Sequence, residues 1–498
     1  MDIQKIINIE KIKKFTIENK LLVICFFLTF VFFLLYHYWT LGWDFASYVI
    51  NARFLFNQGD YSEVLRAPLT SFLLIGAVFF GNLGEYLYIA FAVILFFFAN
   101  FKLSSVLYDK YFNKFGVEKK NIIFLFFIMS LTPFVLEYGL LEGTELLGLA
   151  FFELFLFYFI NNKNSGHFLG LAFLTRYNFL TYFPFMLINK NYKKIIVNLI
   201  LFFAVLSPWL IFNYNKWGNF LMSIVESYNH NISARQDIMR SFDIMHLIFS
   251  INFLIPLLIM GFGYVCFNTI KKKESKIGIK LHILFIIIFI LVLWDYNRTP
   301  LKIPRYLFNI TLPAAYFSLI GLISIINRLK KYEKKLLIGI FIFWIILLFL
   351  TSYGLYNLRT WDDMYKEAGK DILDRNLEMC YVASPHWVPI NYYTNNAYSL
   401  WKTPKEVIQN NGIVIIFPNE ISADDTFTME TIKNLPILKK TDRYWILAKT
   451  NLTSETCSKR FAYSSPATEK PCLTIAEKFE KIKLKEPVEK LCLLFNKI

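Results

Sequence analysis

Residues 21–36 read LLVICFFLTFVFFLLY and contain no charged side chain. About 20 apolar residues are enough to cross the hydrocarbon core of a bilayer, and runs of similar length recur along the chain. The sequence is 56% hydrophobic and 54 of its 498 residues are Phe, whereas soluble domains contain about 45–50% apolar residues. These features predict a polytopic α-helical membrane protein.

The formal net charge of +16 does not indicate a nucleic-acid partner. Most of the Lys residues lie in short loops between apolar runs, where positive charge sets the orientation of a membrane protein. The first run follows a Lys-rich leader and has no small-residue cleavage site, which predicts a retained span with a cytoplasmic N-terminus.

The alternation of apolar runs and Lys clusters predicts about 11 transmembrane helices. We expect two short helices within 168–188, together with spans near 21–39, 84–101, 121–138, 143–160, 195–212, 246–270, 279–295, 304–326 and 336–356. Residues 68–81 are short and begin with Pro. The positive-inside pattern holds throughout only if 68–81 does not cross the membrane, and the C-terminal end then lies outside the cell.

The change in composition near residue 358 predicts two domains. Residues 1–357 form a transmembrane domain with a first outer loop at 40–83, and residues 358–498 form an extracytoplasmic α/β domain. In the second domain a helical pattern at 361–376 is followed by strand-like runs at 379–384, 412–418 and 444–450.

Four of the six Cys residues fall in this C-terminal domain. They are Cys380, Cys457, Cys472 and Cys492. Their spacing fits no zinc pattern, and one or two disulfides are expected in an extracytoplasmic domain without the pairing being readable.

Acidic residues gather at the outer ends of the predicted spans. Asp44 follows the first span directly, and Glu137, Glu142 and Glu145 share the turn between the third and fourth spans. Asp44 and Glu145 also stand where helices begin, so helix capping is an alternative to chemistry for both. Acids crowded on one turn raise each other's pKa.

Basic residues gather at the same predicted face. Arg298, Lys302 and Arg305 fall within eight residues of one outer loop, and Arg176 interrupts an apolar stretch. Flanking bases often snorkel to the interface, but few are expected outside the cell. Guanidinium and ammonium groups bind phosphate, so this cluster favours an anionic ligand.

Five stretches carry a recognisable order of motifs. They are WDFASYVINARFLFNQGDYSEVLRAPLTS (43–71), YGLLEGTE (138–145), GLAFLTRYNFLTYFP (170–184), PWLIFNYNKWGNF (208–220) and RYLFNITLP (305–313). In this order they resemble motifs of the membrane-embedded glycosyltransferases with the C-type fold, a family that includes protein O-mannosyltransferases and the bacterial transferases that move aminoarabinose onto lipid A. The first pattern of that family is an acid after span 1, then Tyr and Ala along an amphipathic helix, then Pro-Pro-Leu.

The resemblance covers about 40–326 and includes departures from the family pattern. Phe45 stands where many members have a second acid after the first. Ala67, Leu140 and Thr144 replace a Pro, an Arg and a Pro of the motifs. These differences are typical of a divergent branch and leave Asp44 without an acidic neighbour in sequence.

The resemblance implies transfer of a sugar from a dolichyl- or undecaprenyl-phosphate donor to a lipid, glycan or protein acceptor at the extracytoplasmic face. It implies Asp44 and Glu145 as catalytic acids. The expected donor-phosphate ligands are Arg66, Arg176, Arg298, Lys302 and Arg305. The expected acceptor-side or supporting residues are Glu142, Tyr48, Tyr138, Tyr177 and Tyr306. Metal use varies within the fold, so a divalent metal is neither required nor excluded.

Two other classes of function are compatible with parts of the pattern. A transporter or flippase of a charged, lipid-linked substrate places ionisable residues near the bilayer midplane, whereas here they gather at outer span ends. A non-catalytic assembly subunit would use the C-terminal domain for a partner. Short loops, and a richness in Lys, Ile, Asn and Phe that is typical of an A+T-rich genome, favour a prokaryotic plasma membrane over an endoplasmic reticulum.

Overall fold

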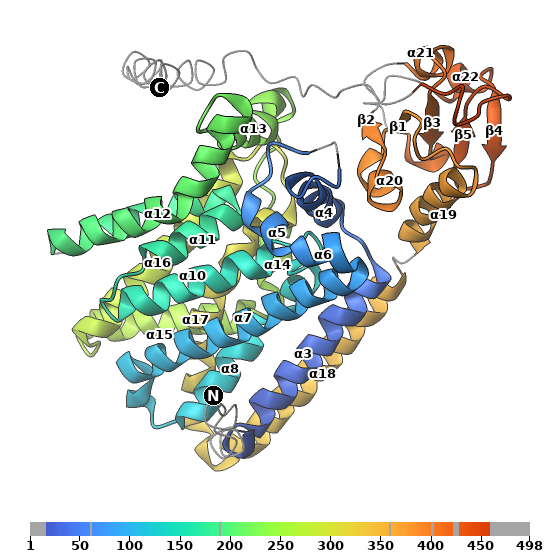
Figure 1. The fold of residues 1–498 in the computed structure, drawn as a ribbon. Coiled ribbons are helices and arrows are strands. Elements are labelled where there is room, and N and C mark those ends of the chain that lie inside the picture. Colours follow the sequence, from blue (N-terminus) through green and yellow to red (C-terminus); the bar gives the residue numbers. More distant parts are fainter. Residues whose placement is uncertain are drawn as a thin grey trace, which may run out of the picture.

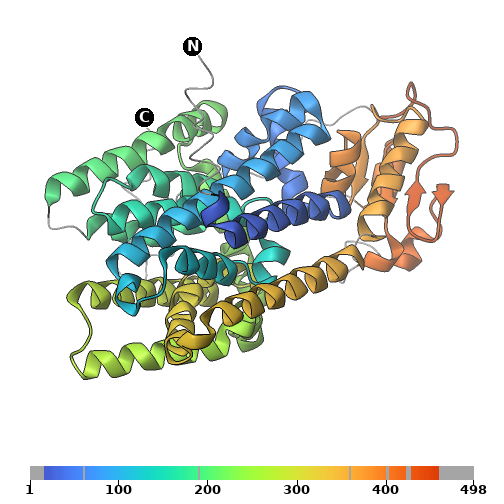
Figure 2. The same cartoon turned by 90° about the horizontal axis from the view of Figure 1, so that it is seen from below.

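The computed structural model describes residues 16–59, 62–188, 191–357, 360–399, 403–421 and 428–458. These residues form a bundle of helices with a small mixed sheet at one end (Figure 1). Figure 2 shows the same arrangement from below, with α3 and α18 running side by side toward the sheet.

Seven helical segments among the described residues are long and apolar enough to cross a membrane. The bundle is therefore that of an integral, multi-pass membrane protein, as predicted. The segments are α3 (Lys20–Trp39), α7 (Asn82–Lys110), α12 (Tyr192–Trp217), α14 to α15 (Ile244–Ile270), α16 (Lys276–Arg298), η5 to α17 (Pro304–Arg328) and η6 to α18 (Lys330–Asn357).

The remaining predicted spans are shorter helices that lie against these seven. Helices α8 (Lys119–Ser130) and α9 (Pro133–Tyr138) are separated before Pro133, and α10 (Glu145–Ile160) is almost wholly buried among its neighbours. A 16-residue helix is about 24 Å long, less than the hydrocarbon thickness of about 30 Å. Burial inside protein is what permits such short elements at membrane depth.

The predicted break at Arg176 is confirmed. Helix α11 (Gly166–Thr175) ends just before it, and the 3-10 helix η2 (Tyr177–Leu187) begins just after it. Pro184 lies inside η2, where its missing N–H and its ring disfavour regular α-helical hydrogen bonding. The break leaves backbone and the Arg176 side chain facing a cavity described below.

Residues 68–80 form two six-residue helices, α5 (Pro68–Leu73) and α6 (Ile75–Phe80), which double back onto α7. The reversal occurs at Gly81, whose φ of +56° is a conformation that favours glycine. Gly84 then lies so close to Gly76 that a Cβ atom would come within 1.9 Å of backbone. Thirteen helical residues reach about 20 Å, which supports the prediction that this segment does not cross.

Helix α4 (Trp43–Leu55) lies between the bundle and the sheet (Figure 1). Every residue from Phe45 to Ala52 is buried. Phe45 and Tyr48 join the core of the bundle, whereas Ala46 and Ile50 join the core beneath the sheet. Helix α4 is therefore not amphipathic as the family pattern implies, because it packs against the core of the bundle on one side and the core of the sheet on the other.

The C-terminal sheet has the strand order β2-β1-β3-β5-β4. Strand β1 pairs in parallel with β2 and β3, while β5 pairs antiparallel with β3 and β4. The three predicted strands correspond to β1 (Val382–Ser384), β3 (Ile413–Ile416) and β5 (Trp445–Leu447), and the missed ones are β2 (Tyr398–Ser399) and β4 (Ile437–Lys440). Helices α19 (Thr360–Asp374), α20 (Trp387–Thr394) and α21 (Pro404–Gln409) complete this part.

A disulfide joins Cys380, just before β1, to Cys457, after β5. It closes a loop with a sequence separation of 77 residues. Loop-closure entropy for that length gives a stabilisation of about 4 kcal/mol. The other two Cys residues of the C-terminal region, Cys472 and Cys492, lie outside the described residues.

Cys457→Ser is accordingly expected to lower the melting temperature of the C-terminal sheet and to make it sensitive to limited proteolysis. Cys266→Ser is the matched control, because Cys266 is an exposed free thiol. Equal thermal stability and equal proteolysis rates for the two variants would show that the loop closure contributes nothing.

Candidate active site

Asp44 lies in the first turn of α4, and two bases from distant parts of the chain bind its carboxylate. Its Oδ1 is 2.7 Å from Arg66 Nη2, and its Oδ2 is 2.6 Å from Arg305 Nη1. Arg66 precedes α5, and Arg305 lies in the 3-10 helix η5 (Pro304–Ile310). The carboxylate of Asp44 therefore forms ion pairs with two arginines.

These two arginines fix the charge of Asp44. Burial by itself raises the pKa of a carboxyl group, but here the guanidinium groups of Arg66 and Arg305 outweigh it. Together they hold the pKa of Asp44 well below its usual range. Asp44 is consequently an anion at neutral pH.

Glu142, in the turn before α10, is the second acid of this cluster. Its Oε2 accepts a hydrogen bond from the backbone N–H of Asp44 at 2.8 Å, and its Oε1 is 3.4 Å from Arg305 Nη1. Burial, followed by the negative charge of Asp44, raises the pKa of Glu142 to about 7, even though Arg305 opposes the shift. Arg305 thus bridges two carboxyl groups of different basicity.

This raised pKa makes stability depend on pH. Glu142 takes up protons more readily in the folded state than at its ordinary pKa of 4.5, so its neutral form favours the folded state. That contribution is present at low pH and is lost as the pH rises from about 4.5 through about 7.

Glu142→Gln is expected to flatten the decline of melting temperature between pH 5 and pH 8, because a glutamine cannot ionise but can still accept the Asp44 N–H bond. Thermal unfolding of the detergent-solubilised protein at several pH values measures this. Glu118→Gln, at an exposed site paired with Lys120, is the control. If melting temperature falls with pH as steeply in Glu142→Gln as in the wild type, ionisation of Glu142 is not the cause of the decline.

Arg176 and Glu145 form a second ion pair beside the first cluster. Arg176 lies at the break between α11 and η2, and Glu145 begins α10. Glu145 Oε2 also accepts hydrogen bonds from the Thr144 backbone N–H at 3.3 Å and from Thr144 Oγ1 at 3.1 Å. Glu145 is therefore the anionic partner of Arg176 in this structure.

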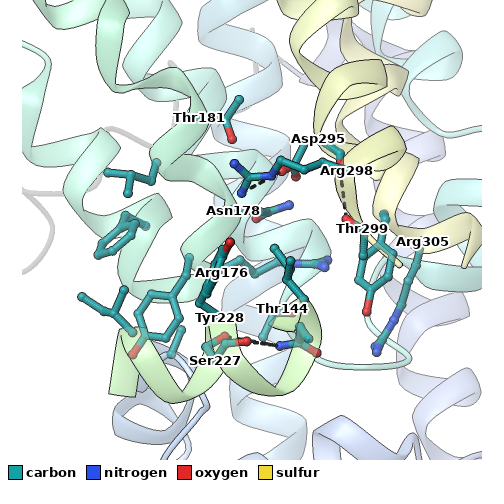
Figure 3. A pocket seen from close by; sticks show the side chains of 18 of the residues that line it. Thr144, Arg176, Asn178, Thr181, Ser227, Tyr228, Asp295, Arg298, Thr299 and Arg305 are labelled. Carbon is teal, nitrogen blue, oxygen red and sulfur yellow. Dashed lines mark hydrogen bonds and ion pairs between the residues drawn. The ribbon is translucent and has the colours of Figure 1, made fainter. Parts of the chain in front are cut away.

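The two clusters share a cavity of about 790 Å³. Its charged lining residues are Asp44, Glu145 and Asp295 with Arg66, Arg176, Arg298 and Arg305. Apolar side chains also line it, among them Leu180, Pro184, Ile290, Leu291 and Trp294. Figure 3 shows Arg176, Asn178, Arg298 and Arg305 arranged around this space. A ligand with an anionic head and an apolar tail matches this mixed lining.

Three of the four predicted tyrosines line the cavity: Tyr48, Tyr177 and Tyr306. The hydroxyl of Tyr177 lies 2.9 Å from Ser223 Oγ and accepts from Trp209 Nε1 at 3.1 Å. Tyr138 does not line the cavity. Its ring instead packs against Phe134 and Phe249, with centroid distances of 5.2 and 6.5 Å.

Arg298 and Lys302 are neighbours in sequence but differ in position. The Lys302 side chain is buried, and its Nζ donates to the carbonyls of Tyr296, Asn297 and Thr299 at 3.1, 2.8 and 2.5 Å. It therefore caps the C-terminal end of α16, where cations are favoured, and the prediction that it binds phosphate is not retained.

Arg298 lies at the end of α16 and faces the cavity (Figure 3). It stacks on Trp294 at 4.7 Å, and its nearest acid, Asp295, is 4.0 Å away. Its side chain is 44% exposed. Arg298 is thus the cavity arginine least committed to an ion pair among the described residues.

Sequence reasoning missed Asp295 and Asn178, and it did not pair Glu63 with Arg66. Asp295 is an acid in a membrane-length helix, and that property alone marks a residue as a functional candidate. Glu63 binds Arg66, with 2.5 Å between Oε2 and Nε. Within the described residues no group of three or more His, Cys, Asp or Glu side chains is arranged to hold a metal ion.

The fold matches that of ArnT from Cupriavidus metallidurans, of which two solved structures align over most of this chain. The structure bound to undecaprenyl phosphate matches with a TM-score of 0.59 at 10% identity, covering 89% of this chain and 100% of ArnT. The apo structure gives 0.58 at 11% identity, covering 88% and 98%.

The predicted resemblance is therefore confirmed at the level of the fold. At this sequence identity the likeness establishes the fold alone. No family model and no curated protein sequence matches the chain.

Proposed function

We propose that this protein is a glycosyltransferase that moves a sugar from a polyprenyl-phosphate donor to an acceptor hydroxyl or amine. The observation that carries the proposal is the cavity, whose lining combines four arginines and three acids with apolar side chains. ArnT, which has the same fold, was solved with undecaprenyl phosphate bound.

The charged and the apolar side chains of this lining suit different parts of the donor. The isoprenoid chain would lie along Leu180, Ile290 and Leu291, and the phosphate would meet Arg298. An arginine fork binds phosphate oxygens bidentately. Because the other cavity arginines are already paired with Asp44 or Glu145, Arg298 is the first available base for an arriving phosphate.

Asp44 would accept the proton of the acceptor. In the transfer step the acceptor oxygen or nitrogen bonds to the sugar C1, the C1–O bond to phosphate breaks, and polyprenyl phosphate leaves with the electron pair. The acceptor proton passes to Asp44. Phosphate that draws Arg66 or Arg305 toward itself weakens their hold on Asp44 and thereby raises its basicity.

The proposed topology follows the charge pattern. About 11 helical passes, with the broken and short helices counted among them, place the N-terminus in the cytoplasm and residues 358–498 outside the cell as a separate domain. The cavity then opens at the extracytoplasmic face of a prokaryotic plasma membrane, where lipid, glycan or protein acceptors are available.

The test is transfer from radiolabelled polyprenyl-phosphate sugars to membrane acceptors by the purified, full-length protein in vesicles. Transfer that depends on donor concentration supports the proposal. Movement of labelled donor across the vesicle without transfer would instead support the flippase alternative.

Arg298→Ala is expected to raise the KM for the donor about 10- to 100-fold, since a hydrogen bond to a charged group contributes about 1.5–3 kcal/mol. Melting temperature should change little, because the side chain is half exposed and loosely paired. Arg240→Ala is the control, an exposed arginine outside the cavity lining. An unchanged KM in Arg298→Ala would remove Arg298 from the phosphate site.

A further inference from the structure

A second cavity of about 450 Å³ lies where the bundle meets the sheet region. The end of α3, the start of α7, and helices α19 and α20 form its walls, and Arg53 of α4 completes them. Asp44 and Tyr48 of the same helix α4 line the first cavity. The two cavities are therefore different sites that share α4.

Five aromatic side chains line this second cavity. Tyr38, Trp39, Tyr86, Tyr392 and Tyr393 all contribute to it. Such rings offer an apolar face together with a polar edge. Tyr38 is 71% exposed, so part of this aromatic surface is open at the mouth.

The charged side chains of the cavity balance one another. Glu85 and Asp363 are its acids, and Arg53 and Lys366 are its bases. Glu85 is held by His37 Nε2 at 2.9 Å and by the Tyr392 hydroxyl at 2.7 Å. A balanced set does not select an anion such as a phosphate headgroup, which prefers clustered positive charge.

Two of these groups are available to a ligand. Asp363 and Lys366 lie about one turn apart on α19 and make no hydrogen bond or ion pair within the described part of the chain. Asp363 is half-buried at the wall, and Lys366 is exposed. They supply an acceptor and a donor beside the aromatic surface.

We propose that this second cavity binds a sugar residue of a glycan. A sugar ring has apolar C–H faces, which aromatic rings cover, and hydroxyl groups that both donate and accept hydrogen bonds. The cavity provides both kinds of contact, and its volume is within the range of about 300–1,000 Å³ typical of small-ligand sites. A role in holding a glycan acceptor rests on the proposed function, whereas the binding itself does not.

The test measures binding without transfer. The full-length protein is purified in a detergent without a sugar headgroup, because maltoside detergents would compete. Maltotriose, chitotriose (the glucosamine trimer) and inorganic phosphate are then titrated separately, and binding is followed by native mass spectrometry. We expect at least one trisaccharide to bind, and Tyr86→Ala and Asp363→Asn each to weaken that binding about tenfold.

Matched variants keep the test specific. Asp374→Asn changes an exposed acid on the same helix α19, and Tyr192→Ala removes an exposed ring at the start of α12, outside the cavity lining. Both should bind sugar as the wild type does, and so should Arg298→Ala of the first cavity. Equal melting temperatures exclude misfolding as the cause of a loss.

Three outcomes would overturn the proposal: no trisaccharide binds, inorganic phosphate displaces the trisaccharide from the Arg298→Ala variant, or sugar binding is lost in Arg298→Ala and retained in Tyr86→Ala. Sugar binding that survives in a protein without transfer activity would contradict the proposed function and leave this site standing. The two proposals can therefore fail separately.

Discussion

Asp44→Asn is expected to lower the rate of sugar transfer about 10²- to 10⁴-fold, the usual contribution of a general base. Asparagine has the same shape as aspartate but cannot take up the proton that leaves the acceptor hydroxyl or amine. The variant should still fold, because each arginine that loses Asp44 keeps another acid: Arg66 retains Glu63, and Arg305 retains Glu142.

Transfer from a radiolabelled polyprenyl-phosphate sugar measures this effect, with melting temperature as the check on folding. Asp109→Asn is the matched control, since Asp109 forms an exposed ion pair with Lys119 at the end of α7. Wild-type transfer in a folded Asp44→Asn variant would refute the proposed role of Asp44.

Arg305→Ala is expected to give the largest loss of stability, about 3–5 kcal/mol, as found when one partner of a buried ion pair is removed. Arg305 is the contact shared by Asp44 and Glu142. Without it two carboxyl groups lie close together with little solvent. Melting temperature in detergent should fall sharply, and Arg298→Ala, at a half-exposed site, should change it little.

A double variant separates lost charge compensation from lost packing. Arg305→Ala combined with Glu142→Gln removes one of the two confronting charges, so it should recover part of the lost stability. Arg305→Lys should lose less stability than Arg305→Ala, because a single nitrogen of Arg305, Nη1, contacts both acids and an ammonium group keeps that positive charge. If the double variant is no more stable than Arg305→Ala, the loss comes from packing.

Much of the fold was predictable because apolar length and Lys clusters report directly on membrane passage. The break at Arg176 was equally readable, since a charge and a proline interrupt an apolar run. The strands β2 and β4 were not, because β2 has two residues and β4 is a partly exposed edge with two lysines. Such short strands are set by pairing in space rather than by local pattern.

The site was predictable in its residue types and not in its pairings. Arg305 meets Asp44 across 261 residues of sequence, a separation at which local patterns carry no information. Arg298 and Lys302 looked alike in sequence, yet the end of α16 turns one toward the cavity and the other onto backbone carbonyls. The position of the end of α16 therefore decides that Arg298, and not Lys302, is available to a ligand.

The double burial of α4 has a consequence for how the molecule unfolds. Ala46 and Ile50 belong to the core of the sheet, while Phe45 and Tyr48, on either side of Ala46 and Ser47, belong to the core of the bundle. Loss of the sheet therefore exposes one side of the helix that holds Asp44. The carboxylate of Asp44 therefore lies where the two cores meet, and we expect the sheet and α4 to unfold together.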